Sequence, residues 1–321
     1  MRAKRGFAKT LGVVLTVALL TAACGGEEGG TTTGAGTEEA DLSGASFTVG
    51  SKEFTEQLVL GQITLQALEA AGATVDDKTG LPGSVQARTA LEGGQIDMYW
   101  EYTGTGWITY LKHTKPIDDP QGQYEAVAKE DMKKNDIAWL PPAPADNTYA
   151  IAASEETLEE DGVSKISDLP GLIKEDPEAS SLCVGTEFAV RDDGLPGIEK
   201  HYGFQWPTDQ IAKVTEGVIY SEIDKSKTCA YGEVFATDGR IAGLGLAVLE
   251  DDKQFFAIYN PSLTVNGKAF DKYGPELEKI FAPIADKLDT ETLQKLNSQV
   301  DVDGLPEKAV AEQWLTEEGL V

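Results

Sequence analysis

The chain has 321 residues, with 54 acidic against 27 basic side chains and a formal net charge of −27 at neutral pH. Such an excess of negative charge disfavours binding to nucleic acid or to anionic lipid, so we exclude functions that depend on either. Three cysteines and two histidines follow no spacing typical of a zinc site, and neither a nucleophile elbow nor a P-loop is present. We therefore expect no enzymatic activity, no metal and no cofactor.

The first 23 residues have the pattern of a secretory signal peptide. Four basic residues precede a short apolar run at 11–20, and three small residues then lead to Cys24. A cysteine at this point is typical of a lipoprotein processing site, so we expect Cys24 to be lipidated; a plain signal peptide with a chance cysteine is the alternative. Removal of residues 1–23 leaves 23 basic against 54 acidic side chains, a formal charge of −31.

Residues 24–43 are predicted to be a flexible tether behind the lipid anchor. They are rich in Gly, Thr, Glu and Ala and show no apolar periodicity. No later apolar run reaches the length of a membrane span, so we expect the rest of the chain to be soluble on the outer face of the cell membrane. About 275 residues are too many for one ordinary core, which predicts two lobes.

From residue 44 onward, strand-like and helix-like segments alternate, which predicts an α/β fold. In this first half, Thr55 is a plausible N-cap and Gly72 a helix terminator. The expected strands are 47–49, 96–100 and 137–140, and the expected helices are 55–71, 84–92 and 120–134.

A proline-rich stretch at 140–144 interrupts this alternation, and a second break follows near residue 260. The breaks predict an outer lobe of residues 44–146 and 261–321 with a middle lobe, 147–260, inserted into it. Two crossovers would form a hinge, with a ligand between the lobes. No internal sequence repeat is evident. The expected strands are 149–153, 182–184, 229–235, 246–249 and 262–265, and the expected helices are 217–225, 275–288, 289–300 and 306–318.

Cys183 and Cys229 lie in two short β-like runs that could form neighbouring strands. Outside the cytoplasm an even pair of cysteines is usually oxidised, so we predict a disulfide between them. Two buried free thiols are the alternative.

Aromatic residues stand at the predicted junctions between lobes. A run at 99–107 leaves a strand for a glycine-rich turn, where open α/β sheets bind ligands. Tyr149 lies at the first crossover, Tyr259 at the second, and Phe235 ends a predicted strand. Several ring faces can hold a quaternary ammonium group, which has no hydrogen to donate, at about 0.5–2 kcal/mol per desolvated ring. Ordinary core packing is the alternative for any single ring.

Five ordered motifs spread over residues 46–320 resemble those of the binding proteins of glycine betaine/choline/carnitine ABC importers, the osmoprotectant-uptake group. The resemblance implies a two-lobed, periplasmic-binding-protein-like (type II) fold and a monomer that delivers its solute to a transmembrane permease with an ATPase. The motifs are 50–57 (GSKEFTEQ), 96–105 (IDMYWEYTGT), 188–196 (FAVRDDGLP), 237–240 (TDGR) and 249–253 (LEDDK).

The resemblance also implies an aromatic cage and a set of polar ligand contacts. Arg191 matches the arginine that holds the ligand carboxylate, a task suited to two parallel hydrogen bonds. Phe235 stands where a tyrosine is usual, and Tyr231 is the alternative for that position. Because Asn147 stands where some members have an aspartate, betaine and choline both remain open as ligands. The implied cage is Tyr102, Tyr149, Phe235 and Tyr259, and the implied polar contacts are Lys52, Thr105, Asn147 and Arg191.

These observations predict an extracytoplasmic, lipid-anchored binding protein for a quaternary-ammonium solute such as glycine betaine, proline betaine, choline or carnitine. Two alternatives stay open. One is a protein of the same fold that binds another solute, such as an amino acid, and the other is a secreted lipoprotein enzyme.

Overall fold

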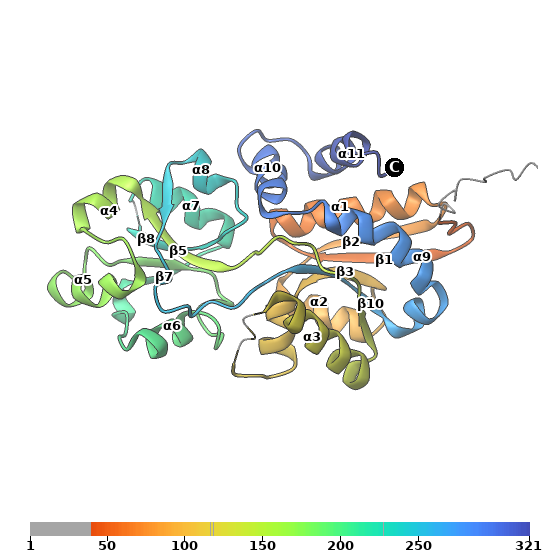
Figure 1. Ribbon diagram of the computed structural model, residues 1–321. Coiled ribbons are helices and arrows are strands. Elements are labelled where there is room, and N and C mark those ends of the chain that lie inside the picture. Colours follow the sequence, from red (N-terminus) through yellow and green to blue (C-terminus); the bar gives the residue numbers. More distant parts are fainter. Residues whose placement is uncertain (1–39, 116, 118, 227) are drawn as a thin grey trace, which may run out of the picture. The chain divides into compact units, whose positions relative to one another are not determined.

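A computed structural model describes residues 40–115, 117, 119–226 and 228–321. The predicted signal peptide, the lipidated Cys24 and the tether up to residue 39 lie outside the described residues. In the described part, two five-stranded mixed sheets are each flanked by helices (Figure 1). The predicted α/β class with two lobes is therefore confirmed. None of the helices in these ranges combines the length and apolar character that crossing a bilayer requires.

The first sheet has the strand order β2-β1-β3-β10-β4. Strand β1 is parallel to β2 and β3, whereas β10 is antiparallel to β3 and β4. We call this sheet with its helices the first lobe. Its strands are β1 (Ser46–Lys52), β2 (Thr74–Leu81), β3 (Met98–Tyr102), β4 (Ile137–Trp139) and β10 (Pro261–Asn266), and its helices are α1 (Thr55–Ala70), α2 (Gly83–Glu92), α3 (Pro120–Asn135) and α9 (Gly267–Asp286).

The second sheet has the order β7-β6-β8-β5-β9, and its strand directions repeat those of the first sheet position by position. The two sheets thus share one topology although the sequence shows no repeat. We call this sheet with its helices the second lobe. Its strands are β5 (Tyr149–Ser154), β6 (Leu182–Val184), β7 (Ile211–Lys213), β8 (Tyr231–Phe235) and β9 (Leu246–Val248), and its helices are α4 (Glu155–Asp161), α5 (Leu169–Glu175), α6 (Leu195–Tyr202), α7 (Glu216–Asp224) and α8 (Arg240–Gly243).

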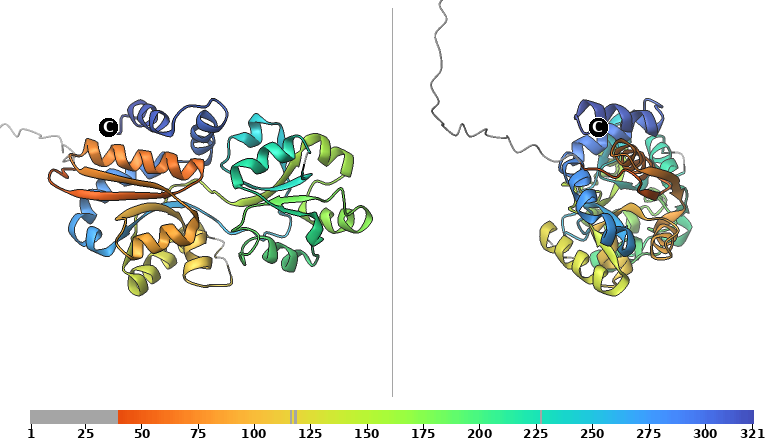
Figure 2. Two further views of the ribbon diagram at one scale, coloured as in Figure 1. Left: turned by 180° about the vertical axis from the view of Figure 1, so that it is seen from behind. Right: turned by 90° about the vertical axis from the view of Figure 1, so that its right-hand side faces the viewer.

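The chain passes between the sheets twice, after β4 and again before β10, and both connections run through the centre of Figure 1. The predicted lobe boundaries at 147 and 260 stay predictions. The view from behind in Figure 2 places the last two helices beside α1. These are α10 (Thr290–Asp301), whose N-cap Asp289 accepts a hydrogen bond from the amide of Thr292, and α11 (Glu307–Glu317).

Most predicted elements are confirmed within a few residues. The sequence did not predict β2, β7, α4, α5, α6 or α8, and one helix start and one N-cap differ from the prediction. Strand β2 was missed because most of its side chains are exposed and polar, so it carries no apolar pattern. Helix α9 begins at Gly267 rather than at Pro275, because the side chain of Asn266 caps it. Thr55 is not an N-cap: it is the first residue of α1, and its hydroxyl donates to Asp301.

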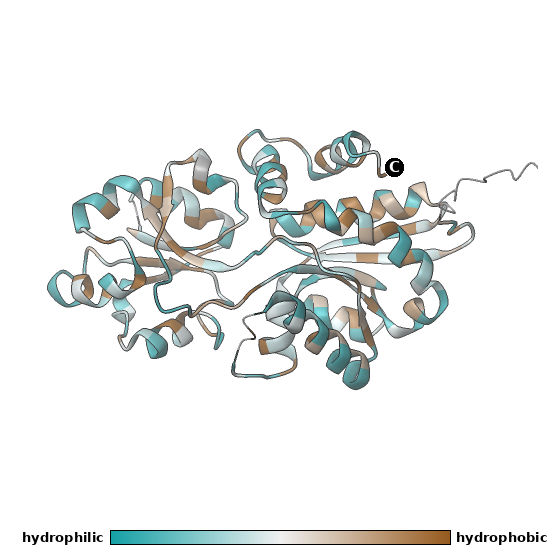
Figure 3. Ribbon diagram, viewed as in Figure 1, coloured by the Kyte–Doolittle hydropathy of each residue, from teal (hydrophilic) through white to brown (hydrophobic). Residues whose placement is uncertain are grey.

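The hydrophobic cores lie against the two sheets. Figure 3 shows hydrophobic residues interspersed with hydrophilic ones along the covering helices, as expected for helices with one face on a sheet. One buried cluster joins α1, α9, α10 and α11 to the first sheet. The cluster of the second lobe includes Tyr102, Tyr149 and Tyr259. These tyrosines are therefore held by a packed core.

Candidate functional site

A cavity of about 210 Å³ is lined by residues of both lobes. All eight side chains predicted to contact a ligand line it, although they come from segments that span more than 200 residues of sequence. They are Lys52, Tyr102, Thr105, Asn147, Tyr149, Arg191, Phe235 and Tyr259.

Five aromatic rings form a continuous arc around this cavity. In order, the ring centroids of Tyr102 and Phe54 are 6.3 Å apart, and those of Phe54 and Phe235 are 5.2 Å apart. The arc continues from Phe235 to Tyr149 at 5.2 Å and from Tyr149 to Tyr259 at 5.5 Å. Phe54, which also lines the cavity, was missed as a cage candidate although it lies in the first recognised motif.

The strand ends explain why these rings converge. Tyr102 is the last residue of β3 and Phe235 the last of β8, while Tyr149 opens β5 and pairs directly with Phe235. Gly104 allows the ring of Tyr259 to approach, because a Cβ on Gly104 would lie 2.7 Å from that ring. The glycine-rich turn after β3 thus has a packing role, and it continues into the π-helical turn η1 (Thr105–Tyr110).

Tyr231, the alternative to Phe235, does not line the cavity. It is fully buried, and its hydroxyl donates to Asp161. Of these two residues, only Phe235 lines the cavity.

Two of the ring hydroxyls donate to buried carboxylates. The hydroxyl of Tyr102 donates to Glu56 at 2.7 Å, and that of Tyr259 donates to Asp193 at 2.6 Å. These bonds fix the ring orientations and place negative charge behind the rings, which favours a cation in front of them.

Asn147 is bonded to the same carboxylate, since its side-chain amide donates to Glu56 at 2.8 Å and to Thr237 at 2.7 Å. Glu56 also accepts from Asn297. Burial raises the pKa of Glu56, although its hydrogen bonds oppose the rise. Although the side chain at position 147 is a neutral amide, an acidic group therefore lies directly behind it.

Arg191 keeps only part of its guanidinium available for a ligand. Its Nε and Nη2 donate to the two carboxylate oxygens of Asp193 at 2.7 and 2.6 Å, and its Nη1 lies 3.4 Å from Glu187. The guanidinium also lies 5.6 Å from the ring centroid of Tyr149. A ligand carboxylate could therefore reach only the edge formed by Nη1 and Nη2.

Lys52 and Thr105 line the cavity from the side of the first lobe. The ammonium of Lys52 is 2.6 Å from Glu101 and lies over the ring of Tyr102 at 4.9 Å from its centroid. Its charge is therefore balanced by Glu101 without a ligand. Thr105 is buried at the start of η1.

Four glutamates that the sequence did not single out as ligand contacts also line the cavity, namely Glu53, Glu187, Glu216 and Glu233. Glu187 accepts hydrogen bonds from the amide and hydroxyl of Ser84 at the start of α2, which join the two lobes. Burial raises the pKa of Glu187, but Lys52 and these bonds outweigh it, so the pKa is lowered. Burial raises the pKa of Glu233 to about 8 and also raises that of Glu216. In so acidic a sequence, single glutamates gave no signal.

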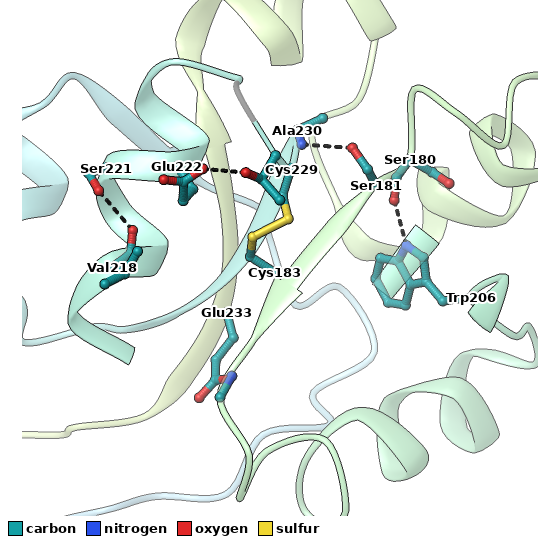
Figure 4. The surroundings of a disulfide bond; sticks show 12 residues. Ser180, Ser181, Cys183, Trp206, Val218, Ser221, Glu222, Cys229, Ala230 and Glu233 are labelled. Carbon is teal, nitrogen blue, oxygen red and sulfur yellow. Dashed lines mark hydrogen bonds between the residues drawn. A yellow bond between two sulfur atoms is a disulfide. The ribbon is translucent and has the colours of Figure 1, made fainter. Parts of the chain in front are cut away.

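Cys183 and Cys229 form a disulfide in the second lobe (Figure 4). It joins the middle of β6 to the segment that leads into β8. Glu233 lies below it in the figure, on the same strand as Phe235. Among the described residues, no group of three or more His, Cys, Asp or Glu side chains is arranged to hold a metal.

Comparisons with known proteins agree with this geometry. The family model for the substrate-binding domain of ABC-type glycine betaine transport systems matches residues 45–317. The chain is 36% identical over 278 residues to the glycine-betaine-binding protein of Pseudomonas aeruginosa, which covers 85% of this chain and 88% of that protein.

Two solved structures are also similar. Apo YehZ from Escherichia coli gives a TM-score of 0.63 at 33% identity, over 86% of this chain and 99% of that one. A glycine betaine/carnitine/choline ABC transporter protein gives 0.67 at 25% identity, over 85% and 99% of the two chains.

Proposed function

This chain belongs to the family of substrate-binding domains of ABC-type glycine betaine transport systems, and we propose that its solute is a quaternary-ammonium compound held in the arc of five rings. Members of this family are binding proteins of ABC importers and not enzymes. The candidate solutes are glycine betaine, proline betaine, choline and carnitine.

One observation carries the proposal: five aromatic rings from both lobes line a single cavity, and carboxylates lie behind two of them. A trimethylammonium group cannot be recognised by hydrogen bonds, because it has no N–H to donate. Ring faces attract it, and each desolvated ring contributes about 0.5–2 kcal/mol. The primary ammonium of an amino acid would instead need hydrogen-bond acceptors, which the ring faces of the arc do not supply.

In this proposal, Tyr102, Tyr149, Phe235 and Tyr259 surround the cation, and Phe54 adds a fifth face. The free edge of Arg191 binds a solute carboxylate. The polar residues nearest to the solute are Lys52, Thr105 and Asn147, with Lys52 and Asn147 acting through their bonded carboxylates.

The two lobes close on the solute about the two connections near residues 147 and 260. A solute that contacts both lobes stabilises the closed form by the difference in its affinity for the two forms. We propose that the closed form docks on a membrane permease, which an ATPase drives. Lipidated Cys24 and the tether 24–43, left after removal of the signal peptide 1–23, would keep the protein beside that permease outside the cytoplasm.

Titration calorimetry of residues 44–321 with glycine betaine, proline betaine, carnitine, choline and proline tests the proposal. We expect saturable binding of at least one quaternary-ammonium compound and none of proline. Tyr102→Ala should weaken every quaternary-ammonium solute that binds by about tenfold, the equivalent of about 1.4 kcal/mol for one ring face.

Binding of proline, or of no candidate by a sample verified to be free of ligand, would favour the alternative of another solute on the same fold. Unchanged affinity in Tyr102→Ala would remove this ring from the cage.

A further inference from the structure

Two of the cavity's carboxylates flank the backbone of Gly185, just after β6. Oε2 of Glu233 accepts a hydrogen bond from the amide of Gly185 at 2.7 Å. Oε1 of Glu216 lies 2.5 Å from the point where a Cβ on Gly185 would stand. Both side chains line the cavity, which therefore has an acidic end as well as an aromatic arc.

Glu233 faces the same cavity as the ring of Phe235. The two residues alternate on β8, so their side chains leave the strand on one face, roughly 7 Å apart along it. Glu233 is 2% exposed. Its Oε2 has the Gly185 amide as donor, but within the described ranges no protein group donates to its Oε1.

Neither carboxylate of this acidic end has a cationic partner within hydrogen-bond reach among the residues that the structure describes. The two basic groups of the cavity are engaged elsewhere, Lys52 with Glu101 and Arg191 with Asp193. The proximity of Glu216 and Glu187 adds to the effect of burial and raises the pKa of Glu233 to about 8, while Arg191 opposes the rise. Oε1 of Glu233 is therefore available to a group of the solute.

A trimethylammonium group and a carboxylate carry no hydrogen-bond donor, so a simple betaine offers none to Oε1 of Glu233. We propose that Glu233, with Glu216 beside it, forms a subsite for a hydrogen-bond donor on the solute. The solute is then a quaternary-ammonium compound that carries an O–H or N–H group within a few atoms of its cation. This inference rests on the proposed function and narrows its substrate class.

Two matched pairs of solutes test the subsite. Carnitine and γ-butyrobetaine differ only in one hydroxyl, and choline and propyltrimethylammonium differ in a hydroxyl against a methyl group. Calorimetry of the wild-type protein should show the hydroxylated member of at least one pair bound about tenfold more tightly, as expected for one hydrogen bond that the other member cannot make.

Glu233→Gln is the matched variant. The side-chain amide oxygen of the glutamine can still accept the hydrogen bond from Gly185, while its NH₂ group replaces the free acceptor oxygen. The preference for the hydroxylated solute should therefore fall from about tenfold to below about threefold. Glu159→Gln, an exposed site in the second lobe, is the control and should keep the full preference. A thermal melt checks that both variants fold.

Binding of the hydroxylated solute should also release protons at pH 7, because the donor favours the ionised form of Glu233. Titrations in buffers of different ionisation enthalpy measure this release, and Glu233→Gln should lose it. Equal affinity for both members of each pair in the wild type would overturn the subsite and leave the proposed function standing. Binding of no quaternary-ammonium compound would instead overturn the proposed function.

Discussion

Strands β3 and β8 occupy the same position in their two sheets, and each carries a buried glutamate near its cavity end, but the surroundings of these glutamates differ. Glu101 on β3 accepts from the ammonium of Lys52, the hydroxyls of Tyr99 and Tyr110, and the amide of Tyr102. Glu233 on β8 accepts only from one backbone amide among the described residues.

The two strands are also fastened differently to their parallel neighbours. In the first sheet, the ion pair of Lys52 with Glu101 joins the end of β1 to β3. In the second sheet, the disulfide joins β6 to the segment before β8, and Glu233 takes no part in this link. The third strand of each sheet thus carries a buried glutamate with a different role. Glu101 has a structural role in the first lobe, and Glu233, by our proposal, binds the ligand in the second.

Glu101→Gln should cause the largest loss of stability. It removes the counter-charge of Lys52, which is 4% exposed, and an unpaired buried charge costs about 3–5 kcal/mol. Urea denaturation measures the change in the free energy of unfolding, with Glu159→Gln as the control. A loss similar to that of Glu233→Gln would contradict the distinction between the two glutamates.

Replacement of both Cys183 and Cys229 by serine should cost about 2–4 kcal/mol, and the loss should be confined to the second lobe. Trp206 is the one tryptophan between residues 147 and 260, and it donates to the carbonyl of Ser180 near the disulfide (Figure 4). When the other tryptophans are replaced by phenylalanine, the fluorescence of Trp206 reports the unfolding of the second lobe. Without the disulfide, this unfolding should occur at a lower urea concentration than with it. An unchanged midpoint would show that the disulfide does not fasten β8.

Arg191→Ala should weaken a betaine by about 10- to 100-fold and choline by less than threefold, because only the betaine has a carboxylate for two charge-assisted hydrogen bonds. Arg240 provides a matched control, since it holds Asp238 in the same way but does not line this cavity. Calorimetry with both solutes measures the effect. Equal losses for betaine and choline in Arg191→Ala would argue against the carboxylate contact.

Glu233→Gln should change the free energy of unfolding in a direction that depends on pH. Because the pKa of Glu233 is raised from 4.5 to about 8, the folded wild type binds an extra proton between these values. Its stability should therefore fall as the pH rises through this window, by at most about 1.4 kcal/mol per pH unit. The variant should lack this slope and become the more stable protein near pH 8. Urea unfolding at pH 5, 6.5 and 8 tests this, and parallel curves would contradict it.

Four of the five rings in the arc could be named from the sequence, because they stand at predicted lobe junctions, at strand ends or in motifs that carry the family resemblance. Phe54 was overlooked because its motif was used for its polar residues alone. Glu233 could not be found, since β8 is buried along nearly its whole length and alternation then gives no contrast between faces. The pairing of Arg191 with Asp193 and of Asn147 with Glu56 depends on side-chain packing, which no spacing in the sequence records.

The hydrogen bonds between Glu187 and Ser84 stabilise the closed form of the solute-free protein. The N-terminus of α2 takes part of its cap from the opposite lobe, so parting the lobes exposes it. A cap of this kind stabilises the closed form by about 0.5–2 kcal/mol. It therefore multiplies the ratio of closed to open solute-free molecules by about 2 to 30. We expect small-angle scattering of the solute-free protein to show fewer closed molecules in Ser84→Ala than in wild type. Closed molecules without solute would compete with loaded molecules for the permease and would slow import when the solute concentration is low. The N-terminus of α2 would thereby help to set how the rate of import depends on the solute concentration outside the cell.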